Sequence, residues 1–277
     1  MRPVDTFIIC ATPRSGSTLL CDLLRRTGAA GRPASYFRRQ SIPGYASRLN
    51  VENCDDMGGE AFFRAYIDAV LIAARSGCTV AGIRIMWESL GELNGRLDVL
   101  FPGLANDAAR LEAVFGKIAY VHLSRGDKLG QAISLAKASQ TGLWHVAPDG
   151  SELERTLPPQ PAEYSRELLQ RNMRQLAADD AAWRSWFDAH GITPLSLTYE
   201  ALSRDPRAVL ARMLAAIGQD PAIASKMEPG TARMADEESR AWAQRFRAET
   251  GAVAEQAAGL PAKTISPGGL PKSAPGR

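Results

Sequence analysis

The stretch from Phe7 to Leu20 constrains the fold more than any other part of the chain. It begins as an apolar run of strand length, passes through a small turn with the sequence Thr-Pro-Arg-Ser-Gly-Ser, and continues as an amphipathic helical pattern. The N–H groups at such a helix start have no partner within the helix, and with the helix dipole they favour an anion. Hydroxyl and guanidinium donors crowd the same turn. An ordinary strand–turn–helix corner needs none of them, so the turn predicts a phosphate-binding loop made of Pro13, Arg14, Ser15, Gly16, Ser17 and Thr18.

Residues 120–134 repeat this strand-into-helix form. Arg125 stands at the end of the predicted strand, and Ser134 lies two turns into the following helix. Taken alone, this segment fits equally well a solvated helix start that happens to carry an arginine. Together with the first loop it predicts two separate anion sites, as required by a nucleotide with phosphates at both ends.

Strand and helix signals alternate along the chain. This alternation predicts an α/β fold, with a mainly parallel sheet of at least four strands flanked by helices on both faces and a ligand at the carboxyl ends of the strands. The predicted strands are Thr6–Ala11, Thr79–Ile85, Ile118–Leu123 and Pro194–Thr198. The predicted helices are Glu60–Ser76, Asp107–Phe115, Asp127–Thr141, Ala162–His190 (as one helix or two) and Pro206–Ile217.

Composition limits the class of protein. The chain has 277 residues, of which 45% are apolar and 23% are charged, as in ordinary globular proteins. A net charge of +3 is too small to indicate nucleic-acid binding. No apolar run reaches the length of a membrane span, and residues 1–20 lack the pattern of a secretory leader, so we expect a cytoplasmic protein. The four cysteines lack the spacing of a metal site, and we expect free thiols in a reducing compartment. Residues 261–277 contain four prolines and three glycines, which predicts a disordered tail.

Several motifs resemble those of sulfotransferases that use 3′-phosphoadenosine-5′-phosphosulfate (PAPS). The resemblance is strongest to the bacterial family that acts on trehalose, lipopolysaccharide and nodulation factors. It rests on residues 12–21, 31–37, 127–144 and 195–206, and it extends over about residues 6–250. It implies one domain over residues 1–260 with a P-loop-like sulfotransferase fold, a carbohydrate or glycolipid hydroxyl as acceptor, no metal, and a homodimer.

The resemblance also implies roles for single residues. Ser17 and Thr18 would hold the 5′-phosphate of PAPS, Arg125 and Ser134 its 3′-phosphate, and Tyr199 its adenine. An equally good interpretation of Tyr199 is a side chain that only packs beside the fourth strand.

The catalytic groups are harder to assign. We expect Arg14 to stabilise the oxygen that bridges sulfur and phosphorus. The family pattern has a carboxylate, its proposed general base, just before a Tyr–Phe pair, whereas this chain has Ala34 and Ser35 there. Glu88, at the end of the second strand, and His145 are the replacement candidates. The competing interpretation of Glu88 is a surface carboxylate at a helix start, and that of His145 is a structural histidine.

The acceptor site is predicted from polar and aromatic residues around two segments, although the aromatic members suit a core equally well. Its predicted members are Ser35, Tyr36, Phe37, Arg38 and Trp144.

Two other functions remain open. A P-loop kinase is disfavoured, because the sequence lacks the Gly-x-x-x-x-Gly-Lys-Ser/Thr pattern. The missing carboxylate before Tyr36 keeps a catalytically idle nucleotide-binding regulator as the second alternative.

Overall fold

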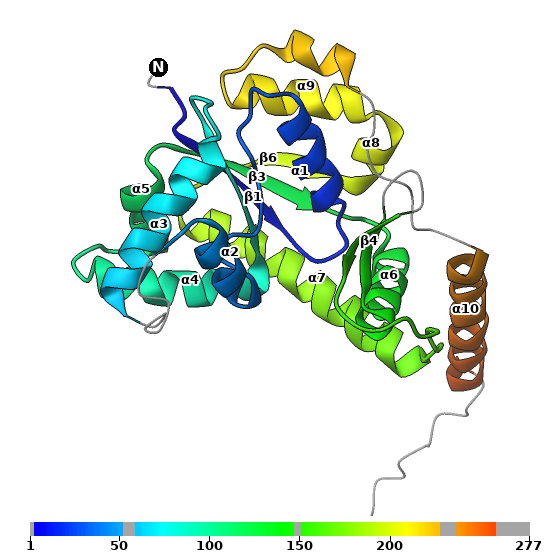
Figure 1. Cartoon of the computed structure of the whole chain (residues 1–277). Coiled ribbons are helices and arrows are strands. Elements are labelled where there is room, and N and C mark those ends of the chain that lie inside the picture. Colours follow the sequence, from blue (N-terminus) through cyan, green and yellow to red (C-terminus); the bar gives the residue numbers. More distant parts are fainter. Residues whose placement is uncertain (1–2, 52–58, 147–150, 228–236, 259–277) are drawn as a thin grey trace, which may run out of the picture.

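The computed structural model describes residues 3–51, 59–146, 151–227 and 237–258. Its helices and strands alternate along most of the chain (Figure 1). The strands are β1 Thr6–Ala11, β2 Ala81–Met86, β3 Ile118–Ser124, β4 Leu143–Val146, β5 Glu152–Arg155 and β6 Leu195–Thr198. The helices are α1 Ser17–Arg26, α2 Ile42–Arg48, α3 Glu60–Arg75, α4 Trp87–Leu100, α5 Asp107–Phe115, α6 Lys128–Thr141, α7 Arg166–Ala189, α8 Tyr199–Arg204, α9 Pro206–Ala216 and α10 Glu237–Ala258, with short 3₁₀ turns η1 Arg39–Ser41 and η3 Pro221–Lys226.

Four of the strands form one parallel sheet in the order β2-β1-β3-β6. The predicted parallel sheet is therefore confirmed. The first strand has the predicted bounds, and the ends of the other three differ from the prediction by one or two residues. Cys10 in β1 lies opposite Ile85 in β2 and His122 in β3, so the carboxyl ends of these three strands share one edge.

Both faces of the sheet are covered, as the alternation of strands and helices predicted. Ile8 and Cys10 of β1 face a core formed with α2, α3, α4, α5 and α7. Phe7, Ile9 and Ala11 face a second core formed with α1, α8 and α9. Successive side chains of a strand point to opposite faces, so a strand buried on both sides is apolar throughout. All six residues of β1 are buried.

The strand order also brings two strand-to-helix loops together. The chain leaves β1 into α1, on one face of the sheet, and leaves the neighbouring β3 into α6, which packs along α7 (Figure 1). When neighbouring parallel strands send their connections to opposite faces, the space between the two loops is the usual ligand site of such sheets. The two predicted anion-binding segments are these two loops.

The structure contains elements that were not predicted. The long loop expected after α6 contains the antiparallel hairpin β4–β5, whose four-residue strands are too short for a clear alternating pattern. Gly142, with a φ of 68°, ends α6 and turns the chain into this hairpin. Helix α4 was not predicted, although Leu90, Leu93, Leu97 and Leu100 form a buried stripe at helical spacing. Helix α7 is one helix, and the predicted tail lies outside the described residues.

Candidate active site

The loop between β1 and α1 has the backbone that the sequence predicted. Gly16 is the residue that precedes α1, with a φ of 85° in the left-handed region that favours glycine. A Cβ atom at Gly16 would lie 2.6 Å from Cδ2 of Tyr199, so the ring also requires a glycine here. Helix α1 has no side-chain cap and no acidic residue in its first turn. Its first N–H groups are therefore left for an external acceptor.

A buried hydroxyl in the same loop lacks a partner. Ser15 has no exposed surface, and its Oγ makes no hydrogen bond within the described part of the chain. Most buried polar groups in proteins are hydrogen-bonded, so an unpaired one calls for an explanation. An oxygen of a bound phosphate or sulfate would provide the missing partner. This residue therefore fits the predicted anion site.

The Arg14 side chain joins the two predicted anion-binding segments. Its Nε donates to Ser134 Oγ at 2.9 Å, and its Nη1 donates to the carbonyl oxygen of Trp144. Burial and the positive charge of Arg125 together lower the pKa of Arg14 to about 10. Arg14 therefore remains a cation at neutral pH, and it lies between α6 and β4.

Arg125 and the Gly16 loop meet at Tyr199. The guanidinium carbon of Arg125 lies 4.3 Å from the centre of the Tyr199 ring. The Cδ2 atom at the edge of this ring is the one that a Cβ at Gly16 would touch. Arg125 Nη1 also donates to the carbonyl oxygen of Arg14 at 3.3 Å. The structure therefore brings the two predicted anion sites into contact. Arg125 and Ser134 are connected through Arg14.

The start of α6 differs from the start of α1. Its backbone N–H groups at Gly126 and Asp127 both donate to Glu200 Oε1, at 3.0 and 3.1 Å. Burial alone would raise the pKa of Glu200, but these N–H donors and Arg125 hold it below its usual value. A carboxylate of the protein thus occupies this helix start. An anion bound near Arg125 would be held by side chains.

A buried ion pair holds the start of the loop between β1 and α1 in place. Asp180 is 3% exposed, and it pairs with Lys128 Nζ and accepts a 3.3 Å hydrogen bond from Thr12 Oγ1. Lys128 also donates to the carbonyl oxygen of Arg125. Gln131 donates to Thr12 Oγ1 and to the carbonyl oxygen of Pro13, at 3.0 and 2.7 Å. These contacts fix the end of β1 relative to α6.

The sequence analysis missed Arg84, which lies near the carboxyl end of β2. Its Nη1 donates to Thr18 Oγ1 and its Nε to Ser35 Oγ, each at 2.8 Å, and Nη1 also reaches Ser17 Oγ at 3.4 Å. A single arginine in an otherwise apolar strand was the available signal, because such a residue needs polar partners in the interior. Arg84 adds a third cation to the site beside Arg14 and Arg125.

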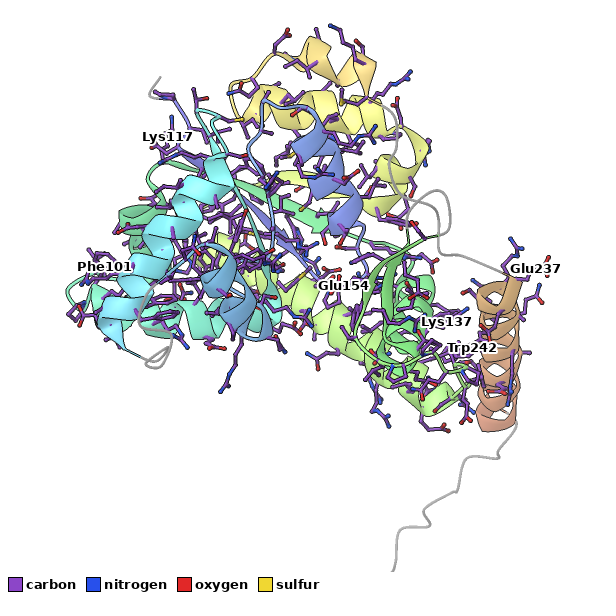
Figure 2. All side chains as sticks on the ribbon, viewed as in Figure 1. Phe101, Lys117, Lys137, Glu154, Glu237 and Trp242 are labelled. Atoms are coloured by element: carbon purple, nitrogen blue, oxygen red, sulfur yellow. The ribbon has the colours of Figure 1, made fainter. Side chains whose placement is uncertain are left out.

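His145 and a second missed residue, Glu154, lie on the facing strands of the hairpin. Nε2 of His145 is 3.0 Å from Thr18 Oγ1 and 3.5 Å from Glu154 Oε2. Figure 2 shows Glu154 on the side of the hairpin that faces the loop before α1. Burial lowers the pKa of His145 to about 3, and Arg14 and Arg84 act in the same direction. The imidazole is therefore neutral at physiological pH.

Glu88, the other predicted base, lies in the first turn of α4 with a side chain that is 55% exposed. Its ion-pair partner is Arg38, at 4.0 Å, and the guanidinium of Arg38 lies 5.9 Å from the centre of the Trp144 ring. Glu88 thus reaches the candidate site through Arg38 and Trp144. Its role as the base stays a prediction.

Two of the predicted acceptor residues lie in the core. Tyr36 and Phe37 are 2% and 3% exposed. The Phe37 ring packs edge-on against Phe63, Tyr66 and Phe115. The packing interpretation left open above therefore accounts for both rings. Ser35, in contrast, contacts Arg84 and so lies at the site.

In the described ranges, no group of three or more His, Cys, Asp or Glu side chains is arranged to hold a metal ion. The described helices also include none that is both long and apolar enough to span a bilayer.

Comparisons with known proteins bear on the family of this chain. The model of the Stf0 sulphotransferase family matches residues 6–249. A protein of Mycobacterium tuberculosis (strain Erdman) named trehalose 2-sulfotransferase is 32% identical over 266 residues, which cover 90% of this chain and 96% of that protein. A protein of the same name from Mycolicibacterium smegmatis is 30% identical over 262 residues, covering 87% of this chain and 94% of its own.

One comparison is with a solved structure, the sulfotransferase domain from the Synechococcus PCC 7002 olefin synthase. It is 18% identical and covers 94% of this chain and 97% of its own, with a TM-score of 0.41, too low to add to the assignment. The family assignment comes from the match over residues 6–249 and from the two mycobacterial relatives. Together they show that this chain belongs to the Stf0 sulfotransferase family.

Proposed function

We propose that this protein transfers a sulfuryl group from PAPS to a hydroxyl group of a carbohydrate or glycolipid. The observation that carries the proposal is the contact of the Gly16 loop and Arg125 with the same tyrosine, Tyr199. PAPS has phosphate groups at both the 5′ and the 3′ position, and two adjoining anion sites suit such a ligand. A donor with only a 5′-triphosphate would need one.

The residues present fit each end of PAPS. Ser15, Ser17 and Thr18, with the uncapped start of α1, would hold the 5′-phosphosulfate, and Ser15 would thereby gain its missing partner. Arg125 and Ser134 would hold the 3′-phosphate. Tyr199 would lie beside the adenosine.

The chemistry follows from this placement. As the acceptor oxygen bonds to sulfur, the bond from sulfur to the bridging oxygen breaks, and negative charge develops on the 5′-phosphate. Arg84 donates to Thr18 at this end of the nucleotide, and Arg14 belongs to the same loop, where fixed donors stabilise developing charge. Removal of one such donor lowers the rate by roughly 100- to 1000-fold in comparable sites.

The names of the relatives suggest the class of acceptor. Both mycobacterial proteins are named for transfer to trehalose, which supports a carbohydrate hydroxyl as the acceptor here. Trp144, with Arg38 beside its ring, offers the aromatic surface that sugar faces commonly contact. Trehalose is therefore the first acceptor to test. The homodimer implied by the family resemblance stays a prediction.

The test has two parts. Calorimetry compares adenosine 3′,5′-bisphosphate, the product of PAPS, with AMP, and labelled PAPS is then incubated with trehalose and other sugars. We expect a clear preference for the bisphosphate and transfer of label to a sugar. Equal affinity for AMP would refute the proposal. Tight bisphosphate binding without transfer to any sugar would favour the idle regulator, and magnesium-dependent use of ATP would favour a kinase.

A further inference from the structure

We propose that Glu154 is the general base that accepts the proton of the acceptor hydroxyl, and that His145 holds the Glu154 carboxylate in position. This inference rests on the proposed function. It assigns a role to a residue that the sequence did not single out.

The β4–β5 hairpin places Glu154 close to the loop between β1 and α1. In the register of β4 and β5, His145 and Glu154 are direct partners. Glu154 Oε2 is 3.5 Å from His145 Nε2, which is in turn 3.0 Å from Thr18 Oγ1. The carboxylate and the hydroxyl of Thr18, a residue that would hold the sulfuryl donor, thus lie beside the same ring nitrogen. A general base must lie within hydrogen-bond reach of the proton it removes, and this position allows that for an acceptor at the sulfur.

The protonation state of His145 follows from its neighbours. The Glu154 carboxylate can only accept a hydrogen bond, and Thr18 Oγ1 already accepts one from Arg84. The contact with Glu154 is therefore attractive only when Nε2 of His145 carries the hydrogen, and the second lone pair of Thr18 Oγ1 can then face the same N–H group. Because the pKa of His145 is held near 3, the ring stays neutral and does not compete for the substrate proton. It orients the carboxylate and leaves its charge intact.

The other carboxylates around the site are committed to partners. Asp180 is buried against Lys128, Glu200 accepts two backbone N–H groups, and Glu88 pairs with Arg38. Glu154 Oε1, in contrast, makes no hydrogen bond within the described residues, and the Glu154 side chain is 44% exposed. One oxygen therefore lies beside His145, and the carboxylate as a whole is partly exposed.

Ser35 lies at the other end of the same set of contacts. Arg84 links Ser35 Oγ to Thr18 Oγ1, and Thr18 leads to His145 and Glu154. A serine hydroxyl is a poor base at neutral pH, so Ser35 cannot take the proton itself. In the proposed step the acceptor O–H proton moves to Glu154 Oε1 as the O–S bond forms. The electrons of the broken S–O bond remain on the departing 5′-phosphate, and Glu154 later releases the proton to water.

The experiment compares Glu154→Gln with a matched control, Glu152→Gln. Both residues lie on β5, and their side chains are 44% and 45% exposed, but Glu152 pairs with Arg155. We expect Glu154→Gln to lower kcat by about 100- to 10,000-fold, the usual contribution of a general base, and to leave bisphosphate affinity by calorimetry unchanged. Formate should partly restore the activity of Glu154→Ala.

The position of Glu154 is also tested without turnover. The NMR signal of the His145 ring should shift in Glu154→Gln and stay in place in Glu152→Gln. An unshifted signal, an unchanged kcat, a loss explained by weaker bisphosphate binding, or a comparable loss in Glu152→Gln would each overturn the assignment. A large loss of kcat confined to Glu88→Gln would overturn it in favour of Glu88. If the wild-type protein binds the bisphosphate but sulfates no acceptor, the proposed function fails, and this assignment fails with it.

Discussion

The substitution Gly16→Ala tests whether the Gly16 loop and Tyr199 are packed as described. The backbone at Gly16 has a φ of 85°, and holding alanine in the left-handed region costs roughly 1–2 kcal/mol. The new Cβ would also lie 2.6 Å from Tyr199 Cδ2 and 3.3 Å from its Cε2, so the ring must move. Such overpacking costs roughly 1–3 kcal/mol. The expected total is about 2–5 kcal/mol of unfolding free energy.

Gly28 provides the matched control at the other end of α1. Its φ is 66°, but a Cβ there would meet nothing within 4 Å. Gly28→Ala should therefore cost only the backbone term of roughly 1–2 kcal/mol. The two variants should differ by roughly 1–3 kcal/mol, which for a chain of this size is about 2–12 °C in Tm. Thermal unfolding monitored by circular dichroism measures this difference.

The same pair of variants separates binding from stability. Movement of the Tyr199 ring would remove its contact with Arg125, so Gly16→Ala should weaken bisphosphate binding at least tenfold, or about 1.4 kcal/mol. Gly28→Ala should bind normally. In a double-mutant cycle, Tyr199→Ala should relieve part of the stability cost of Gly16→Ala. Equal melting temperatures for Gly16→Ala and Gly28→Ala, together with strict additivity in the cycle, would refute the packing of Tyr199 on the loop.

Three further predictions concern charged groups of the site. Arg84→Lys keeps the charge but loses the fork of donors to Thr18, so bisphosphate affinity by calorimetry should fall about fivefold, the cost of about 1 kcal/mol for one hydrogen bond. Because the pKa of His145 is lowered from 6.5 to about 3 by folding, the unfolded chain binds a proton that the folded chain does not. The free energy of unfolding should therefore fall as pH drops through that range, and His145→Gln should flatten the dependence in urea titrations. Asp180→Asn should cost roughly 3 kcal/mol by urea unfolding, because it leaves the ammonium of Lys128 without its buried counter-charge.

Each of these variants has a control of the same chemical change. Arg96→Lys alters an arginine that pairs with Glu92 within α4, His190→Gln alters a histidine at the end of α7, and Asp179→Asn alters the neighbour of Asp180. The controls should leave the affinity, the pH dependence and the stability nearly unchanged. A control effect as large as that of its partner would contradict the corresponding argument.

The sequence by itself determined the elements whose signals are local. The buried apolar run of β1, the glycine before α1 and the hydroxyls beside it are all adjacent in the chain, so the strand, the turn and the helix start could be predicted as a unit. Repeated strand and helix signals were enough to predict a parallel sheet covered on both faces. Arg125 stood out because it ends the same type of strand-to-helix connection, and Ser134 was singled out by the resemblance to the sulfotransferase 3′-phosphate site.

Only the tertiary structure decided which distant side chains meet. The register of β2 against β1 brings Arg84 to Thr18, and the short hairpin brings Glu154 to His145 across four-residue strands that carry little pattern of their own. The occupation of the α6 start by Glu200 likewise depends on the position of β6 beside β3. Contacts of this kind depend on strand order and packing between segments far apart in the chain. Local periodicity carries no information about them.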